Sequence, residues 1–310
     1  MADGLLAAIL YATVVAGTPL LIAALGELIT ERAGVLNLGV EGMMAVGAMV
    51  GFAAAHTTGS AAAGVAAGFV GGAAMAAIFA LLVLTLLANQ VASGLALAIF
   101  GVGLAAFAGK AWEAESLSAV PVWRVPLLAD LPVLGPALFA HQWLVYLSWG
   151  LLAAVVWFLT RSRTGLALRA VGESPAAAHA IGHPVLRIRW LATLFGGAMA
   201  GLAGAFLSIF HTPLWAEGMV AGKGWIALAL VVFATWRPLR AALGAYLFGG
   251  VMVAQLFVQG SGLRVELPAQ FLGALPYLAT IGVLVAISRN RQALRLDAPA
   301  SLGQPWHAER

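Results

Sequence analysis

The sequence contains no cysteine and few charged residues. None of its 310 residues is Cys, so disulfides and thiolate metal sites are excluded. Only 9% of the residues are Asp, Glu, Lys or Arg, whereas a soluble domain carries roughly 25%. The chain is therefore too poor in charge to be an ordinary soluble protein.

Motifs for nucleotide binding, metal binding and hydrolysis are also missing. A phosphate-binding loop ends in Lys followed by Ser or Thr, but Lys110 is followed by Ala and Lys223 by Gly. His179 and His183 fall on either side of a predicted helix end, so they do not form a metal-binding pair on one helix. We therefore expect no enzyme active site, no metal site and no cofactor bound by this chain.

Apolar residues are what the sequence has in excess. Hydrophobic residues make up 62% of the chain, and the mean hydropathy is +0.98. They occur in long runs such as 61–87 and 144–159, and about 20 apolar residues in a helix cross a bilayer. We predict an all-α, polytopic bundle that is integral to a membrane. The start of the chain has no basic region, which predicts that the first span is not a cleaved signal peptide.

The apolar runs predict about nine spans, within a range of eight to ten. They cover about 5–26, 35–55, 61–88, 90–110, 141–160, 190–210, 224–236, 240–259 and 268–288. The run 35–55 is rich in glycine, and the run 224–236 is shorter than the roughly 17 residues of a full span. We expect these two to be candidates for broken or re-entrant helices, whose exposed backbone must be covered by protein or water.

Basic residues indicate which ends of the spans face the cytoplasm. The net charge of +4 comes largely from arginines in short loops, which is the usual mark of the cytoplasmic face and not of nucleic-acid binding. We expect the loop 161–189 and the tail 289–310 to be cytoplasmic. Alternation then places 111–140 and the N-terminus outside. Residues 1–310 are predicted to form one transmembrane domain, with its core at about 5–288.

The cytoplasmic loop 161–189 contains the signals of a short, independent helix. Ser174 is a good N-cap, Pro175 suits the first helical position, and Gly182 is a typical stop. A capped helix outside the membrane has little core of its own to bury. We therefore favour a docking role over a simple connecting loop.

Polar residues within the apolar runs are candidates for a translocation pathway. Glu41 follows Asn37 by four residues, so the two would share a helical face, and a carboxylate at membrane depth is functional by default. Glu41 either lines the route of a solute or bridges a break in the helix. Asn89 and Ser93 form a second pair, which either lines a polar route or marks a capped helix entry.

Four ordered segments resemble a known family. The segments 26–48, 89–104, 163–182 and 217–250 are similar to those of permease subunits of bacterial ABC importers. Within this family, "GVLNLGVEGMM" looks most like the nucleoside and simple-sugar group, which is related to the permeases for ribose and branched-chain amino acids. The resemblance implies nucleosides as substrate, then simple sugars, then branched-chain amino acids.

The resemblance also implies that the protein lies in the plasma (inner) membrane of a bacterium, and it implies how the protein works. The family's coupling helix would correspond to Gly172, Glu173, Ser174, Pro175, Ala176, Ala177, Ala178, His179, Ala180 and Gly182. The partners of the whole chain would be a separate ATPase subunit that binds ATP-Mg, a second permease copy or a similar permease, and an extracytoplasmic solute-binding protein or lipoprotein. A self-contained channel or ion-coupled carrier remains the alternative from the residues alone.

Overall fold

The computed structural model describes residues 2–260 and 297–307, together with the single positions 274, 278, 282 and 285. The predicted span 268–288 and the tail residues 289–296 therefore lie outside the continuously described ranges. The elements are α1 (Ala2–Arg32), α2 (Val40–Thr58), α3 (Ala61–Ala80), η1 (Leu81–Thr85), α4 (Gln90–Gly109), η2 (Lys110–Trp112), β1 (Trp123–Arg124), α5 (Leu134–Leu138), β2 (Ala140–His141), α6 (Trp143–Arg161), α7 (Arg163–Glu173), α8 (Pro175–Ala180), α9 (Val185–Phe206), η3 (Leu207–His211), α10 (Lys223–Phe233) and α11 (Pro238–Gly260).

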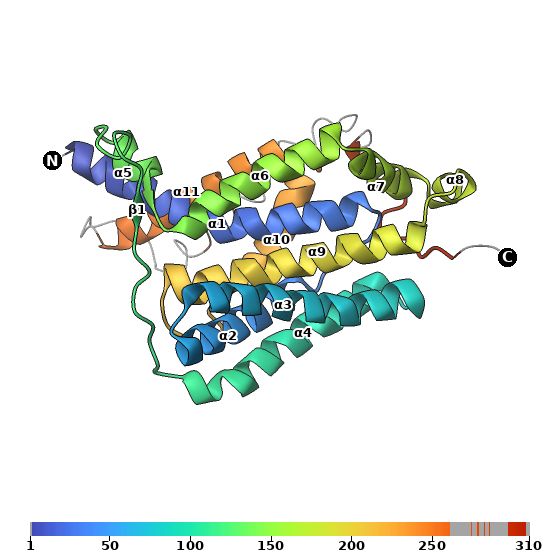
Figure 1. Cartoon of the computed structure of the whole chain (residues 1–310), viewed down its shortest axis with the longest axis horizontal. Coiled ribbons are helices and arrows are strands. Elements are labelled where there is room, and N and C mark those ends of the chain that lie inside the picture. Colours follow the sequence, from blue (N-terminus) through green and yellow to red (C-terminus); the bar gives the residue numbers. More distant parts are fainter. Residues whose placement is uncertain are drawn as a thin grey trace.

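Helix α9 is the centre of the bundle. It packs against α1, α2 and α3, while α11 lies along α1 and α4 lies along α2 (Figure 1). Most of the continuous helix from Val185 to His211 is buried. Apart from the two-residue antiparallel ribbon of β1 and β2 and two isolated β-bridges, the described residues are helical or irregular, so the predicted all-α class is confirmed.

Six described helices are long and apolar enough to cross a membrane. They cover Gly4–Arg32, Ala61–Thr85, Gln90–Trp112, Trp143–Arg161, Val185–His211 and Pro238–Phe257. This supports a polytopic membrane protein, but six is fewer than the nine spans predicted. Helix α2, which carries Glu41 and His56, and the 11-residue helix α10 are not among the six.

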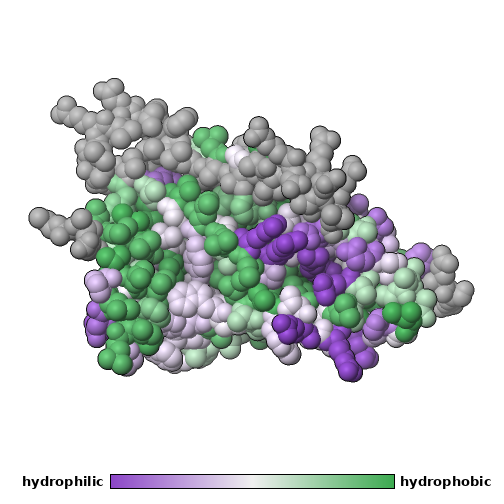
Figure 2. All heavy atoms as spheres, turned by 90° about the horizontal axis from the view of Figure 1, so that it is seen from above, coloured by the Kyte–Doolittle hydropathy of each residue, from purple (hydrophilic) through white to green (hydrophobic). Residues whose placement is uncertain are grey.

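The connecting regions 111–140 and 161–189 lie at opposite ends of the bundle. Helix α5 and the ribbon lie near the N-terminal end of α1, whereas α7 and α8 lie at the other end (Figure 1). This arrangement agrees with the predicted alternation of 111–140 and 161–189. Figure 2 shows hydrophilic side chains gathered toward the end that carries α7 and α8, with apolar side chains over much of the rest.

Glycines allow the central helices to touch backbone to backbone. A Cβ atom on Gly201 of α9 would lie 2.8 Å from the Cα of Gly72 on α3 and would collide with the Gly68 carbonyl oxygen. A Cβ on Gly47 of α2 would in turn collide with Gly201. Small residues at such interfaces are how helices pack in lipid, where the hydrophobic effect no longer drives association.

Gly201→Ala is predicted to destabilise this packing by about 1–3 kcal/mol, the usual effect of overfilling a packed interface. Thermal unfolding of the purified protein in detergent measures the change. Gly103→Ala on α4 is the matched control, because a Cβ there would meet no atom within 4 Å. Equal midpoints for the two variants would contradict the prediction.

Candidate functional site

The helix predicted after Ser174 is present as α8. Its N-terminus is capped, because the Ser174 Oγ accepts a hydrogen bond from the Ala177 N–H at 3.3 Å, and Pro175 is its first residue. At the other end Gly182 has a φ of +92°. The N–H groups of Gly182 and His183 donate to carbonyls of the last turn, which is the closure that a left-handed glycine permits. The prediction of a helix capped at both ends is confirmed.

Helix α8 packs against a small apolar cluster. Its Ala178 is 2% exposed and packs with Val171 of α7 and Val185 of α9. Most of the remaining α8 residues are exposed, and Ile181 just beyond the helix is 74% exposed. Helix α8 thus presents an open face of small side chains at the hydrophilic end of the molecule.

Helix α7 joins α8 tightly to the bundle and was not predicted from the sequence. The Ser162 Oγ caps it by accepting a hydrogen bond from the Gly165 N–H at 2.9 Å. A Cβ on Gly165 would collide with the Phe158 carbonyl oxygen of α6, and one on Gly172 would collide with the Arg32 carbonyl oxygen of α1. We call α7 and α8 together (residues 163–180) the α7–α8 unit.

Residues 33–39, which connect α1 to α2, are held by buried polar side chains. The Glu27 Oε1 accepts a hydrogen bond from the Asn37 N–H at 3.2 Å, and the Gln90 Oε1 accepts one from the Leu36 N–H at 2.8 Å. The Asn37 Oδ1 accepts a third from the Gly39 N–H at 2.9 Å. Glu27, Asn37 and Gln90 are each at most 3% exposed. Side chains therefore satisfy backbone groups that have no helical partner.

The prediction that Asn37 and Glu41 share a helical face is wrong. Helix α2 begins at Val40, so Asn37 precedes the helix and the two residues do not share a helical face. Asn37 forms hydrogen bonds with Gly39, with Glu27 and with the Met43 sulfur atom. Glu41 is bonded to a different part of the chain.

Glu41 caps helix α10. Its Oε1 and Oε2 accept hydrogen bonds from the N–H groups of Gly222 and Gly224, each at 2.7 Å, and Glu41 is 7% exposed. A carboxylate is favourable at a helix N-terminus, where unpaired N–H groups carry partial positive charge. The 11 residues of α10 cover about 16 Å, roughly half of a 30 Å bilayer core. Helix α10 therefore begins within the bundle, and Glu41 supplies the acceptors that its first turn lacks.

A cavity of about 180 Å³ borders Glu41, with Ala45, Trp215 and Val220 among its lining residues. Glu41 therefore holds the N-terminus of α10 and also lies beside this cavity. Its predicted role in the solute pathway stays a prediction.

Asn89 and Ser93 lie at the start of α4. The Asn89 Oδ1 accepts a hydrogen bond from the Ala92 N–H at 3.0 Å, as an N-cap does. The Ser93 N–H donates to the Asn89 carbonyl oxygen at 3.0 Å. This is the capped helix entry that the sequence offered as one interpretation, while a pathway role for the pair stays a prediction.

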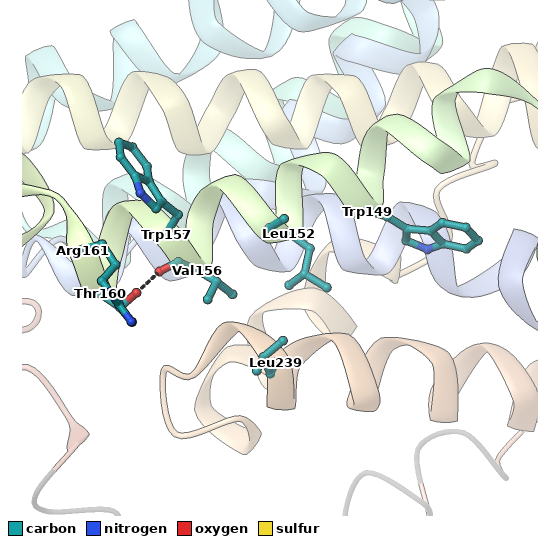
Figure 3. Close-up of a pocket in the computed structure, with 8 residues that line it drawn as sticks. Trp149, Leu152, Val156, Trp157, Thr160, Arg161 and Leu239 are labelled. Carbon is teal, nitrogen blue, oxygen red and sulfur yellow. Dashed lines mark hydrogen bonds between the residues drawn. The ribbon is translucent and has the colours of Figure 1, made fainter.

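A groove of about 820 Å³ lies between α6 and α11 (Figure 3). It is lined by Trp149, Leu152, Ala153, Val156, Trp157, Thr160, Arg161 and Leu239. The Thr160 hydroxyl donates to the Val156 carbonyl oxygen of its own helix at 2.7 Å, as the dashed line shows. The lining offers few free polar groups, so we assign no solute to this groove.

Three polar residues that bond to the backbone of the loop 33–39 were given no role from the sequence. Glu27 on α1, Gln90 on α4 and Arg189 on α9 are each at most 3% exposed. The signal for Glu27 was available, because "GELITER" ends an apolar run with two carboxylates. Among the described residues, no three His, Asp or Glu side chains lie close enough to hold a metal ion.

Comparison with known proteins identifies the family. Residues 9–284 match the family described as the permease component of branched-chain amino acid transport systems. The chain belongs to this family of permeases. It is 45% identical to TsgC13 of Haloferax volcanii, provisionally assigned as a glucose ABC transporter permease, with 98% of both chains covered. No solved structure matches the chain.

Two nucleoside transport proteins are also similar to this permease. It is 31% identical to the nucleoside ABC transporter permease NupC of Lactococcus lactis, covering 90% of this chain and 92% of NupC. It is 32% identical to the guanosine ABC transporter permease NupQ of Bacillus subtilis, covering 97% of both. The protein is thus an ABC permease subunit, a multi-pass protein of the plasma (inner) membrane, and not itself an enzyme.

Replacing Glu41 is predicted to impair transport without preventing membrane insertion. Glu41→Gln keeps one acceptor oxygen for α10, whereas Glu41→Leu keeps none. Each lost charge-assisted hydrogen bond is worth about 1.5–3 kcal/mol, so we expect uptake to fall for Gln and to fall further for Leu. Membrane content by immunoblot and solute uptake by cells measure the two effects.

The control is Glu115→Gln, because Glu115 is exposed and contacts only a half-exposed His56 among the described ion pairs. It should transport like the wild type. Normal uptake by Glu41→Leu would show that the buried carboxylate has no polar role.

Proposed function

We propose that this permease imports nucleosides. The proposal is supported by the similarity to NupC and NupQ over nine-tenths or more of the chain. A nucleoside is a polar solute that needs a protein-lined route through an apolar bundle.

A simple sugar is the second candidate, favoured by the 45% identity to TsgC13. Sugars and nucleosides share a hydroxyl-bearing ring, so one pathway chemistry suits both. Branched-chain amino acids, which the family description names, come third because they lack this ring.

Transport is driven by a separate ATPase subunit that binds ATP-Mg. The observation that carries this part of the proposal is the exposed, doubly capped α8 at the hydrophilic end of a chain that has no P-loop. Residues Gly172 to Gly182 dock into the ATPase, and closure of the ATPase pushes on α8. A six-residue helix closed at both ends is stiff enough to pass this push to the spans.

The permease forms a single transmembrane domain of about nine spans. Three further segments are proposed to cross the membrane in addition to the six long helices. They are α2, the half-length α10 with the turn that precedes it, and residues 268–288. An odd number of spans places the two ends of the chain on opposite sides of the membrane, so a cytoplasmic tail 289–310 places the N-terminus outside. The α7–α8 unit, which the structure places opposite the N-terminal end of α1, then faces the ATPase.

The complete importer contains two permeases, two ATPase subunits and an extracytoplasmic solute-binding protein or lipoprotein. The second permease is another copy of this chain or a similar chain. Asn37, Glu41, Asn89 and Ser93 are proposed to line or support the central route. Membership of an ABC permease family argues against the self-contained channel or carrier that the residues alone had left open.

Uptake of radiolabelled guanosine, glucose and leucine tests the substrate. We expect guanosine uptake to depend on this permease and on its ATPase partner. Dependence of glucose uptake alone would assign the protein to sugars. Guanosine uptake that survives loss of the ATPase would overturn the proposed mechanism.

A charge on the exposed face of α8 is predicted to block docking. Ala177 is the third helical residue, where an Asp side chain suits the helix dipole and leaves the fold intact. We expect Ala177→Asp to weaken ATPase binding by about tenfold or more, equivalent to about 1.4 kcal/mol, as measured by co-purification from detergent.

Ala119→Asp provides the matched control for that experiment. Ala119 is also exposed but lies in the loop 111–140 at the opposite end. Equal ATPase recovery with the two variants would remove α8 from the proposed interface.

A further inference from the structure

The segment 297–307 near the C-terminus is bonded to the end of helix α7. The Ser301 N–H and the Ser301 hydroxyl both donate to the Gly172 carbonyl oxygen, at 3.0 Å and 2.7 Å. Ser301 is 5% exposed. A residue 129 positions away in sequence therefore holds the junction between α7 and α8.

The same serine is bonded to a buried arginine that reaches the loop 33–39. Arg189 is 1% exposed, and its Nη2 donates to the Ser301 Oγ at 3.0 Å. Its Nε donates to the Ala33 carbonyl oxygen at 3.1 Å, and its Nη1 donates to the Gln304 carbonyl oxygen at 3.2 Å. Arg189 therefore joins α9, the segment 297–307 and the α1–α2 connection at one point.

Backbone contacts reinforce this junction. The Gly303 N–H donates to the Gly34 carbonyl oxygen at 3.2 Å. Gly34 has a φ of +86°, and a Cβ there would lie 2.7 Å from the Arg189 Nη2. Only glycine fits both the left-handed conformation and the close approach.

The end of the segment 297–307 packs against the apolar cluster under α8. Trp306 packs against the cluster of Val171, Ala178 and Val185, and its ring meets the ring of His179 edge-on at a centroid distance of 5.4 Å. Because Ala178 is the buried residue of α8, Trp306 forms part of the surface against which α8 packs.

The start of the segment 297–307 contacts a third part of the chain. Asp297 forms an ion pair with Arg237, with an N–O distance of 2.9 Å. Its carbonyl oxygen accepts a hydrogen bond from the Arg32 Nη1 at 3.1 Å, and Arg32 also donates to the Trp236 carbonyl oxygen at 2.9 Å. The segment therefore contacts the end of α1 and the turn before α11 as well as the α7–α8 unit.

We propose that residues 297–307 act as a clasp, in which Ser301 and Trp306 are positioning residues that link the movement of α8 to the loop 33–39. This proposal rests on the coupling role proposed for α8. The loop 33–39 leads directly into α2, whose second residue is Glu41, so the clasp connects the docking helix to the cap of α10. The exposed face of α8 stays free for the ATPase.

A clasp with this role sets the efficiency of coupling rather than the ATPase reaction. When the link is loosened, nucleotide hydrolysis continues but moves α8 without moving α2. We expect Ser301→Ala and Trp306→Ala to reduce solute uptake by about fivefold or more, the range of typical coupling between sites, at nearly unchanged ATP hydrolysis.

The experiment uses the complete transporter in proteoliposomes, with radiolabelled guanosine and glucose as probes. ATP hydrolysis and uptake are measured in the same vesicles, and the result is the number of ATP molecules hydrolysed per solute imported. Gln304→Ala is the matched control, because the side chain of Gln304 is exposed and its carbonyl oxygen, which accepts from Arg189, is unchanged. Trp306→Phe retains an aromatic ring and should restore most of the coupling.

If Ser301→Ala and Trp306→Ala leave the number of ATP molecules hydrolysed per solute unchanged, the proposed clasp is wrong. This holds even if ATP hydrolysis and solute uptake both become slower, because a purely structural role would lower the two rates together. A ratio that rises equally in Gln304→Ala would also overturn it. Uptake by the wild-type complex that does not require ATP would instead overturn the proposed function.

Discussion

An unpaired N–H or C=O group inside an apolar bundle costs several kcal/mol, and this constraint explains three of the buried polar side chains of the permease. Glu27, Glu41 and Gln90 bond to backbone where the helices are interrupted. Glu41 accepts from the N–H groups that open α10, while Glu27 and Gln90 accept from the loop before α2. The fold can therefore contain a half-length helix and an irregular loop within the bundle, because each break is matched by an acceptor on a neighbouring helix.

Glycine contacts make the centre of the bundle rigid. Helices α2, α3 and α9 meet through Gly47, Gly72 and Gly201 without intervening side chains. A closely packed interior shifts as a unit instead of deforming gradually. We therefore expect a displacement at the Val185 end of α9 or at the loop 33–39 to move these helices together.

Local signals in the sequence predicted local structure well. Ser174, Pro175 and Gly182 define α8 through their own conformational preferences, so a window of nine residues was enough. The partner of Glu41 could not be predicted, because Gly222 and Gly224 lie more than 180 positions away and only the fold brings them close. The expected pair of Asn37 and Glu41 failed for a related reason: glycine-rich backbone before Val40 is bent by tertiary hydrogen bonds, so helical periodicity does not extend to Asn37. Arg189 was read as a loop charge, since nothing local shows that its acceptors are distant carbonyl oxygens.

The division of α8 into one buried residue and an open outer face has an evolutionary consequence. The side that holds the helix in place depends on Ala178 and on its packing with Val171, Val185 and Trp306. The outer face carries no such duty to its own protein. If this face docks on the ATPase as proposed, its residues are free to change with the surface of the ATPase inherited with the permease, and grafting a few of them from a paralogue would yield chimeras driven by a foreign ATPase.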